Sequence, residues 1–507
     1  DCGMEQGPDI YENQEIPVNP ADIDYVLLTH AHIDHSGLLP LLYKRGFKGT
    51  IFSTYATSDL CEVMLRDSAH IQEFEAEWRN RKAKRAGKPE YVPLYTIADA
   101  DGASKLFCGC PYGERIHLAD GIDIRFTDVG HLLGSASIEI WMKEDDCSKK
   151  IVFSGDIGNK NKPLIRSPQY IRQADYVVME STYGGRFHKN TGDHVEEFAR
   201  VIQETLDKGG NVVIPAFAVG RTQEVLNYIR IIKEKNLVTG HGVFPVYLDS
   251  PMAVEATGVF KDNMMDCYNE ETKELVKKGI NPISFPGLHL SITSSDSVAI
   301  NFNEEPKVII SAAGMCDAGR IRHHLKHNLW RPECTILFAG YQAVGTLGRS
   351  ITEGREEVKL FGESIEVKAR IEKIEGISGH ADETGLLEWV GSFMEKPSQV
   401  FVVHGDDTVC DAFAETVKET YGINAMAPFS GSSYDLKEGC FVTVTKGIPI
   451  QKPAANEATK KAAGVFARLL AACDRLRRVV MHNEGGANKD LARFADQINS
   501  LCDKWDR

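Results

Sequence analysis

The hydrophobic pattern of the first part of the chain predicts strands that end in metal-capable side chains. Apolar runs predict buried strands over residues 25–29, 150–154 and 176–179, and an alternating pattern predicts a half-buried strand over residues 122–128. Each strand is followed within three residues by a histidine or a carboxylate, namely His30, Asp156, Glu180 and His131. Because α/β proteins commonly place ligands at the carboxyl ends of their strands, we expect these side chains to meet at one edge of a sheet.

From about Asp193 the pattern changes to helices that alternate with near-continuous apolar strands. Helices are predicted up to residue 208 and over residues 221–234, and strands over residues 211–214, 244–248, 307–310 and 335–338. This alternation is typical of a second α/β unit with a parallel sheet. After it, His380 opens a predicted helix and His404 follows the buried strand 399–403. These two histidines can join the first set only if the middle unit is an insertion into the first domain.

Four metal-capable side chains crowd the single turn His30-Ala31-His32-Ile33-Asp34-His35. Neutral imidazoles and a carboxylate are the ligands that borderline divalent cations such as zinc prefer. His30 and His32 could hold one metal, and Asp34 and His35 a second. The alternative is a solvated polar turn, but three of the chain's 16 histidines within six residues argue against it. A shared metal also explains His131 and Asp156, since a buried charge without partners is costly.

Composition narrows the classes of protein. With 507 residues, 42% of them hydrophobic, the chain is long enough for two or more domains. It has no apolar run of about 18 residues, so no membrane span is expected. Twelve scattered cysteines are typical of a reducing compartment, and we expect a cytoplasmic protein. Cys108 and Cys110 lack the second pair that a zinc ribbon needs, which favours a loop.

The charge of the chain argues against binding nucleic acid by bulk electrostatics, because the formal net charge is -14. The most basic run, residues 79–88, is interpreted as a solvated helix face. Three loops combine glycine with arginine, a pairing that suits phosphate or a plain packing turn. These loops are residues 215–221, 313–320 and 340–349.

The two ends of the chain carry less information. Residues 448–453 are predicted to be a linker, and residues 457–482 and 489–506 to be helices that form a hairpin on the body or a dimer contact. The chain begins at Asp1 without an initiator methionine or a leading strand, so we expect N-terminal strands to precede it.

The ordered motifs resemble the β-CASP branch of the metallo-β-lactamase-fold nucleases, which includes the nuclease subunit of the cleavage and polyadenylation specificity factor and bacterial RNase J. The motifs are Asp1, His30 to His35, His131, Asp156, Glu180, His380 and His404. The resemblance covers about residues 1–447 and implies an α/β fold, a metallo-β-lactamase αββα sandwich with an inserted α/β β-CASP domain and a C-terminal helical tail. The predicted segments are 1–190 for the first part of the metallo-β-lactamase domain, 191–355 for the β-CASP domain, 356–447 for the second part with the RNA specificity region, and 448–507 for linker and tail.

Carried over residue by residue, the resemblance implies a site with two Zn²⁺ ions, for which Mn²⁺ is a substitute. His30, His32 and His131 would hold one ion, Asp34, His35 and His404 the other, and Asp156 would bridge them. Asp1 would support the turn from beneath. The predicted catalytic residues are His380, Glu180, Asp34 and Asp156. In the implied mechanism a metal-activated hydroxide attacks phosphorus, while His380, oriented by Glu180, protonates the departing ribose oxygen.

The implied function is a ribonuclease that cuts RNA internally and leaves a 5′-phosphate and a 3′-hydroxyl. RNA-processing members carry histidine at the position of His404, where DNA-processing members carry valine. The alternatives are a 5′-to-3′ exoribonuclease of the RNase J type, a non-catalytic RNA-binding scaffold subunit, and a non-nuclease hydrolase of the same fold. The complete ligand set argues against the scaffold, and the inserted unit argues against the non-nuclease hydrolase. The implied partner is an RNA substrate. No membrane partner is expected, and a homodimer is an open alternative.

Overall fold

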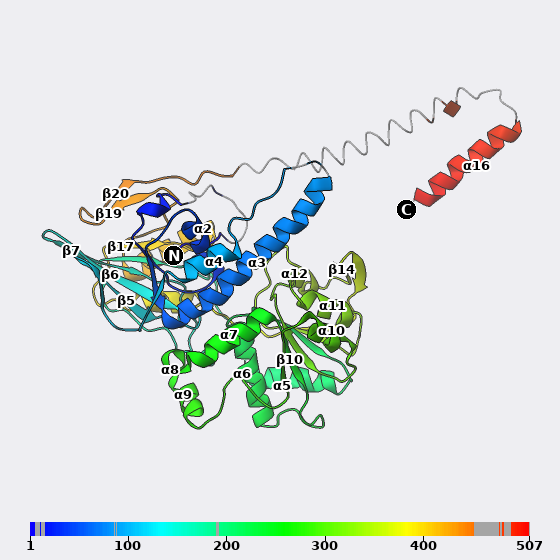
Figure 1. The fold of residues 1–507 in the computed structure, drawn as a ribbon, viewed down its shortest axis with the longest axis horizontal. Helices are drawn as coiled ribbons and strands as arrows, with labels where there is room; N and C mark the ends of the chain where they lie inside the picture. Colours follow the sequence, from blue (N-terminus) through cyan, green and yellow to red (C-terminus); the bar gives the residue numbers. More distant parts are fainter. Residues whose placement is uncertain are drawn as a thin grey trace. The chain divides into compact units, whose positions relative to one another are not determined.

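The computed structural model describes residues 1–5, 11, 16–85, 87, 89–188, 192–450, 476, 479–480 and 488–505. The chain forms two compact units, of which Asp1–Gly7 with Gln14–Lys446 make up the first and Pro8–Asn13 with Gly447–Arg507 the second. The second unit contains helix α16 (Asn488–Trp505), drawn in red in Figure 1, and an antiparallel bridge between Tyr11 and Pro449. The predicted helix over residues 457–482 lies outside the described residues, apart from helical residues 476, 479 and 480.

A seven-stranded sheet forms the centre of the first unit. Its strand order is β18 (Ala425–Met426), β17 (Gln399–Val402), β8 (Tyr176–Met179), β7 (Cys147–Phe153), β6 (Ala136–Glu144), β5 (Ile122–Asp128) and β4 (Ile116–Ala119). Strands β4 to β7 are antiparallel neighbours, whereas β7, β8, β17 and β18 run parallel. The register pairs Val402 with Met179, so Glu180 and His404 leave the same edge of the sheet although they are far apart in sequence.

A second, three-stranded parallel sheet carries the metal-capable turn. It consists of β1 (Tyr25–Leu27), β2 (Thr50–Thr54) and β3 (Phe107–Cys110), with the short 3-10 helix η1 (Pro20–Asp22) before β1. Its helices are α1 (Ile33–Ser36), α2 (Leu39–Lys44), α3 (Tyr55–Arg85) and α4 (Ile97–Ser104). Leu27 and Phe52 pack against Ile124, Phe126 and Ile138 of the larger sheet, so apolar contacts join the two sheets.

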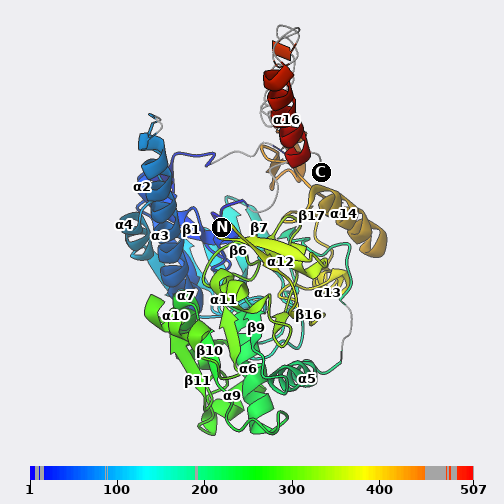
Figure 2. The ribbon, with the colours of Figure 1, turned by 90° about the vertical axis from the view of Figure 1, so that its right-hand side faces the viewer.

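Helices and a hairpin cover the parallel half of the large sheet. Val177 and Val400 pack against helices α13 (Glu383–Val390) and α14 (Asp407–Tyr421), which lie beside β17 in Figure 2. On the opposite face, Tyr176 and Phe401 pack against the hairpin β19 (Ser433–Asp435) and β20 (Cys440–Thr443). Because both faces are covered, β8 and β17 are continuous apolar strands rather than alternating ones.

The inserted unit is a six-stranded parallel sheet with helices on both faces (Figure 1). Its strand order is β11 (Leu288–Ser291), β10 (Val246–Asp249), β12 (Val308–Ser311), β9 (Val212–Pro215), β13 (Thr335–Phe338) and β16 (Arg370–Lys373). One face packs on α5 (His194–Leu206), α6 (Arg221–Glu234) and α7 (Pro251–Asp262). The other packs on α10 (Ser294–Phe302), α11 (Ile321–Asn328) and α12 (Leu347–Thr352). The predicted insertion of a parallel α/β unit is confirmed.

Smaller elements complete the inserted unit. Helices α8 (Met264–Cys267) and α9 (Glu270–Lys277) follow α7, and a hairpin of β14 (Glu357–Leu360) and β15 (Glu363–Glu366) precedes β16. Strand β16 pairs with β13, so the inserted sheet continues past residue 355, where the sequence places the end of this domain. The sequence predicts strand around residues 365–374, but the polar pattern Arg-Ile-Glu-Lys does not show to which sheet this strand belongs.

Candidate metal centre

The metal-capable turn leaves β1 and is held from beneath by Asp1. Its carboxylate accepts hydrogen bonds from Thr29 N at 2.7 Å and Thr29 Oγ1 at 2.8 Å, and it lies 2.7 Å from His35 Nδ1. A Cβ on Gly3 would lie 1.6 Å from the Asp34 carbonyl oxygen, so only glycine allows this segment to approach the turn. The supporting position expected for Asp1 is therefore the one that the structure has.

A first group of ligand-type side chains consists of His30, His32, His131 and Asp156, whose donor atoms lie within 4.8 Å of one another. His32 Nδ1 is 3.1 Å from His30 Nε2 and 3.2 Å from His131 Nε2. Asp156 Oδ2 lies 3.5 Å from His30 Nε2 and 3.6 Å from His131 Nε2. Three imidazole nitrogens and one carboxylate oxygen thus face a common point.

A second group consists of Asp34, His35 and His404. His404 Nε2 lies 4.0 Å from Asp34 Oδ2, and Asp156 Oδ1 lies 3.3 Å from His35 Nε2 and 3.4 Å from His404 Nε2. His404 has φ 51°, a left-handed conformation that is uncommon for residues other than glycine and that recurs at functional sites. The two oxygens of Asp156 consequently face different groups of histidines.

The third group pairs His380 with Glu180 beside Asp156. His380 Nδ1 lies 3.3 Å from Glu180 Oε1 and 3.9 Å from Asp156 Oδ2. Glu180 is 1% exposed, and its carboxylate accepts hydrogen bonds from the backbone N–H groups of Ile157 and Thr182. Glu180 is therefore a fixed partner of His380 rather than a surface charge. The helix predicted from His380 begins later, as α13, because Asp382 caps it through Gly385 N.

Burial sets the protonation of the first group. It lowers the pKa of His30 and His131 well below the ordinary histidine value and lowers the pKa of His32 to about 4. These imidazoles are neutral at neutral pH, which is the form that binds a metal. Burial alone would also lower the pKa of His380, but the charge and hydrogen bond of Glu180 raise it to about 9.

The donor set fits a metal. Within the described part of the chain, the buried atoms His35 Nε2 and Asp156 Oδ1 have no hydrogen-bond partner and lie 3.3 Å apart. A buried carboxylate oxygen without a donor is costly. Histidine nitrogens and carboxylate oxygens are also the ligands that zinc takes. The structure thus brings together all seven residues predicted to hold metal, together with the pair Glu180 and His380.

A buried ion network links this site to the inserted unit, and sequence analysis did not find it. Lys162 Nζ donates to the His131 carbonyl at 2.7 Å and lies 3.4 Å from Glu224 Oε1. Arg221 binds Glu224 Oε2 at 2.5 Å and donates to the Ile377 carbonyl at 2.9 Å, three residues before His380. Its members come from distant parts of the chain, and only Arg221 stood in a motif.

Each of the three glycine and arginine loops has an arginine that is paired with a carboxylate. Arg221, Arg320 and Arg349 are each paired with a carboxylate, of Glu224, Asp249 and Glu353 respectively. Sequence analysis also missed His188, whose Nε2 lies 2.9 Å from the His380 carbonyl oxygen and whose backbone N–H donates to Asp382. His188 thereby fixes the segment that carries His380.

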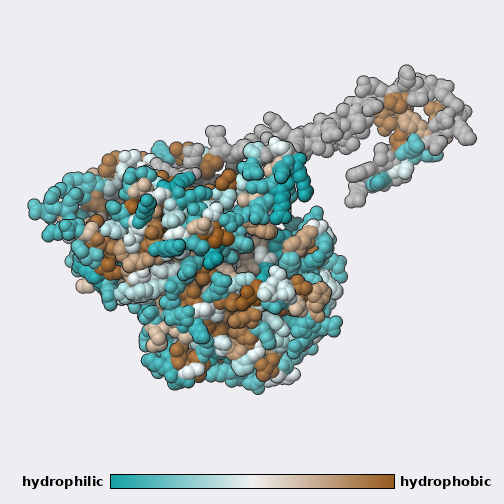
Figure 3. Space-filling view, in the orientation of Figure 1, coloured by the Kyte–Doolittle hydropathy of each residue, from teal (hydrophilic) through white to brown (hydrophobic). Residues whose placement is uncertain are grey.

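Other candidate features lie apart from the metal centre. Cys108 and Cys110 are on strand β3 rather than in a loop, and neither belongs to a ligand-type group of the described residues. Residues 79–85 of the basic run form the C-terminal end of α3, where Arg79 and Arg81 pair with Glu75 and Glu77 in solvent and hydrophilic side chains cover the surface (Figure 3). No helix in the described ranges has the length and the apolar content needed to cross a membrane.

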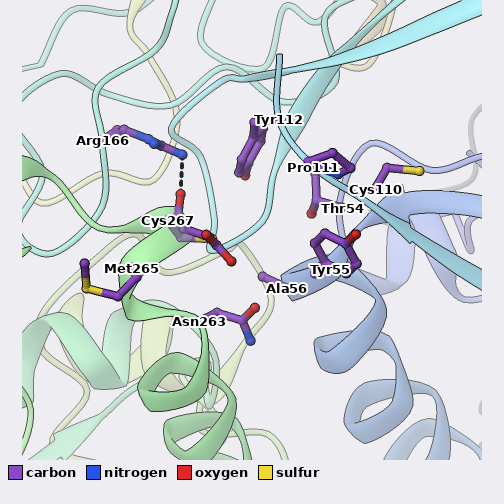
Figure 4. Close-up of a pocket in the computed structure, with 11 residues that line it drawn as sticks. Thr54, Tyr55, Ala56, Cys110, Pro111, Tyr112, Arg166, Asn263, Met265 and Cys267 are labelled. Atoms are coloured by element: carbon purple, nitrogen blue, oxygen red, sulfur yellow. Dashed lines mark hydrogen bonds between the residues drawn. The ribbon is translucent and has the colours of Figure 1, made fainter. Parts of the chain in front are cut away.

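A cavity of about 250 Å³ lies between the first domain and the inserted unit, and its lining contains none of the ligand-type residues (Figure 4). Arg166 borders it, forms an ion pair with Asp128 at 2.7 Å and donates to the Asp266 carbonyl at 2.5 Å. These contacts join the end of β5 to α8.

Two facing sheets, an inserted parallel unit and a buried histidine and aspartate centre define a metal-dependent hydrolase. Family models match the chain in three places: the metallo-beta-lactamase superfamily at residues 1–53, the Beta-Casp domain at 222–351, and the Zn-dependent metallo-hydrolase RNA specificity domain at 364–428. Each match lies within the corresponding predicted segment.

Curated relatives point to the same family. The chain is 34% identical over 408 residues to Ribonuclease TTHA0252 of Thermus thermophilus, which covers 80% of the chain and 87% of that protein. It is 32% identical to an RNase J-like protein of Methanocaldococcus jannaschii over 85% of the chain and 92% of that protein. It is 31% identical to the transcription termination factor FttA of Methanosarcina mazei, over 84% of the chain and 66% of that protein.

The chain belongs to the β-CASP family of metallo-β-lactamase-fold ribonucleases. The predicted fold class and the predicted enzyme class, a metal-dependent ribonuclease, are therefore confirmed.

Proposed function

We propose that this chain is a zinc-dependent endoribonuclease that holds two Zn²⁺ ions and leaves 5′-phosphate and 3′-hydroxyl ends. The observation that carries the proposal is the position of Asp156, which is 2% exposed and faces a different set of histidines with each oxygen. Oδ2 faces His30 and His131, whereas Oδ1 faces His35 and His404. A carboxylate in this position suits the bridging role in a two-ion site.

In this proposal the residues that would hold the ions are those of the two groups. His30, His32 and His131 would hold one ion, Asp34, His35 and His404 would hold the other, and Asp156 would belong to both. When bound, the ions supply Lewis-acid activation of water and neutralise charge on the phosphate. Mn²⁺ is the expected substitute, because it accepts the same imidazole and carboxylate ligands.

His380 and Glu180 form the proton-delivery pair in this proposal. Glu180 engages His380 Nδ1, so the other ring nitrogen is left to protonate the departing ribose oxygen. His188 and Asp382 hold the segment around His380, which keeps the ring beside Asp156. Asp34 would act as a ligand of the second ion and Asp156 as a ligand of both.

The choice of RNA and of internal cleavage rests on the family. The RNA specificity model spans both His380 and His404, and His404 is the residue expected in RNA-processing members. The similarity to an RNase J-like protein supports the second candidate, an exoribonuclease that works from a 5′ end. The chain is also similar to a transcription termination factor. A role on nascent RNA would involve the same class of substrate, RNA.

A circular RNA separates these functions, because it has no end for an exonuclease. The protein loaded with Zn²⁺ or Mn²⁺ is incubated with circular RNA, with linear RNA labelled at either end, and with the matching DNA. We expect the circle to be opened, the products to carry 5′-phosphates, and EDTA to abolish the reaction. If the circle stays intact and the linear RNA is shortened from its 5′ end, the protein is an exonuclease and not an endonuclease.

Variants assign the residues in the same assay. Asp156→Ala is expected to lose both metal and cleavage, whereas His380→Ala keeps its metal and loses most of its cleavage. His117→Ala is the matched control, since His117 is an exposed histidine that pairs with Asp123 on the surface. Full cleavage by either site variant would contradict the assignment.

A further inference from the structure

A line of aromatic rings and one arginine leads away from the metal centre onto the inserted unit. The His131 and His380 rings lie 4.4 Å apart, and the Tyr183 ring lies 5.7 Å from the His380 ring. The Arg186 guanidinium lies 5.7 Å from the centre of the Tyr183 ring and 5.6 Å from that of Tyr341. Contacts of this kind fix the guanidinium between two aromatic faces. Tyr341 belongs to the loop after β13, so the line crosses from one domain to the other.

Phe217 lies on a neighbouring loop, which packs against Gly314. Its ring is 3.2 Å from the position that a Cβ on Gly314 would take, and Gln342 donates to the Gly314 carbonyl at 3.0 Å. Gly314 therefore connects the Phe217 loop after β9 with the Tyr341 loop after β13. The glycine allows the ring to lie close against the backbone.

Arg186 and Tyr341, the outer members of this line, and Phe217 are exposed to solvent. Phe217 is 53% exposed and Tyr341 is 47% exposed. Arg186 is exposed as well, and among the residues that the structure describes no carboxylate forms an ion pair with it. Neighbouring exposed aromatic rings are uncommon on a soluble surface and mark binding sites. Arg186 differs in this respect from Arg221, Arg320 and Arg349, which all have carboxylate partners.

We propose that Arg186, Phe217 and Tyr341 form a binding strip for unpaired nucleotides of the RNA next to the cleaved bond, an inference that rests on the proposed ribonuclease function. Tyr341 and Phe217 stack on bases, and Arg186, whose guanidinium lies against the Tyr341 ring, binds a phosphate beside the base on Tyr341. Stacking requires bases that are free of a duplex, so the strip selects single-stranded RNA. It also compensates locally for a chain whose formal net charge is -14.

Binding without cleavage tests the strip directly. The full chain is kept in EDTA, and its affinity for a fluorescent single-stranded RNA is measured by anisotropy for wild type, Tyr341→Ala, Phe217→Ala and Arg186→Gln. Each alanine variant is expected to bind roughly tenfold more weakly or worse, because one stacked base contributes about 1–3 kcal/mol. Arg186→Gln is also expected to bind more weakly, because it loses the charge that contacts the phosphate. Tyr341→Phe keeps the ring and is expected to bind as wild type does. Phe302→Ala is the control, an aromatic residue that is 72% exposed on α10.

Abasic RNA identifies the stacked base and separates stacking from general damage to the fold. Removing the base at one position should weaken binding to wild type about tenfold and binding to Tyr341→Ala hardly at all, since the ring that the base contacts is already absent. Thermal unfolding of each variant shows whether it is folded. The strip is overturned if no abasic position weakens wild-type binding, or if Tyr341→Ala binds RNA as tightly as Tyr341→Phe.

The two proposals fail in different ways. A wild-type protein that binds single-stranded RNA through the strip in EDTA but never cuts it in Zn²⁺ contradicts the ribonuclease mechanism and leaves the strip standing. A protein that cuts RNA equally well with and without the Tyr341 ring contradicts the strip and leaves the ribonuclease standing. Equal binding to single-stranded and fully paired RNA also overturns the strip, because a duplex offers no free bases.

Discussion

Two buried carboxylates lie at the carboxyl edges of the two larger sheets, and each faces histidine. Asp156 follows β7 and is 2% exposed, and Asp249 ends β10 and is 0% exposed. Burial by itself raises the pKa of both carboxyl groups, yet their surroundings hold the pKa of each well below its usual value. By burial and charge alone the two sites look alike.

Their hydrogen bonds differ. Asp249 Oδ1 accepts from Ser291 Oγ and Arg320 Nη1, each at 2.7 Å. Asp249 Oδ2 accepts from Ser297 Oγ at 2.5 Å and lies 2.6 Å from His324 Nε2. Asp156 Oδ1, in contrast, has no hydrogen-bond partner among the described residues. The protein itself supplies hydrogen-bond partners to both oxygens of Asp249, but it supplies none to Asp156 Oδ1 among the described residues. This difference distinguishes a structural network from a metal centre.

Loss of the carboxylate charge should therefore have opposite consequences at the two positions. Asp156→Asn is expected to lose bound metal and to cut RNA at least about 10³-fold more slowly, because several kcal/mol of transition-state stabilisation depend on the ions. The fold should survive, because Asp156 Oδ1 has no hydrogen bond among the described residues that the substitution could break. Zinc content by atomic absorption and initial rates of RNA cleavage measure both effects. Retained zinc together with a normal rate would remove the distinction.

Asp249→Asn is expected to keep its metal and lose stability. The substitution leaves Arg320 and the fully buried His324 without their anion, and breaking such a buried pair costs about 3–5 kcal/mol. Urea unfolding measures the loss, with Asp120→Asn on the surface as the control. Zinc content and specific activity at low temperature should stay near the wild-type values, and a variant that is stable but without metal would contradict this assignment.

The pH dependence of stability sharpens the same contrast. Hydrogen bonds from His324, Ser297, Ser291 and Arg320 outweigh the effect of burial and lower the pKa of Asp249. The unfolded carboxyl has a pKa of about 3.9, so the stability that it contributes is full above this value and is lost as the pH falls toward the lower folded pKa. We expect the stability difference between wild type and Asp249→Asn to shrink below about pH 4. A difference that stays constant down to about pH 2 would contradict the shift.

Metal removal should affect one centre and leave the other unchanged. A ligand present at 100 times its dissociation constant stabilises the folded state by about 2.7 kcal/mol. EDTA is therefore expected to lower the unfolding temperature of wild type and of Asp249→Asn by similar amounts, and not that of Asp156→Asn. Differential scanning fluorimetry with and without added Zn²⁺ measures the shifts. An equal shift in Asp156→Asn would place the metal elsewhere.

The sequence predicts the regular parts of this fold well and its junctions poorly. Strands β5, β8 and β13 and helix α6 have the predicted bounds, because β5 alternates, β8 and β13 are continuous apolar runs, and the apolar positions of α6 repeat with the helical period. Strand β16 is polar and lies at a sheet edge, so its membership depends on pairing with β13 rather than on its own pattern. The start of α13 depends on the cap provided by Asp382.

The residues of the metal centre were also predictable only where a local pattern places them. The side chains His30, His131, Asp156, Glu180 and His404 follow strand ends, and this position made them predictable. Asp249 also ends a strand, but no pattern shows that serines, an arginine and a histidine satisfy it. Lys162 and Glu224 were equally invisible, since their partners come from distant parts of the chain. Contacts over long sequence distances are what the sequence pattern leaves out.

Lys162 gives the smallest effect and tests whether the inserted unit supports the metal centre. Its side chain is 8% exposed, and Nζ donates to the carbonyl of the ligand-type residue His131 while facing Glu224. Lys162→Met removes this support but leaves Glu224 paired with Arg221, so no buried carboxylate loses its last partner. Supporting groups of this kind contribute about 10- to 100-fold to metal affinity or activity. We expect zinc affinity, measured by competition with a chelator, to fall by that factor, whereas Lys160→Met, at an exposed lysine, should match wild type. Equal zinc affinity in both variants would show that the contacts of Lys162 with His131 and Glu224 do not support the metal centre.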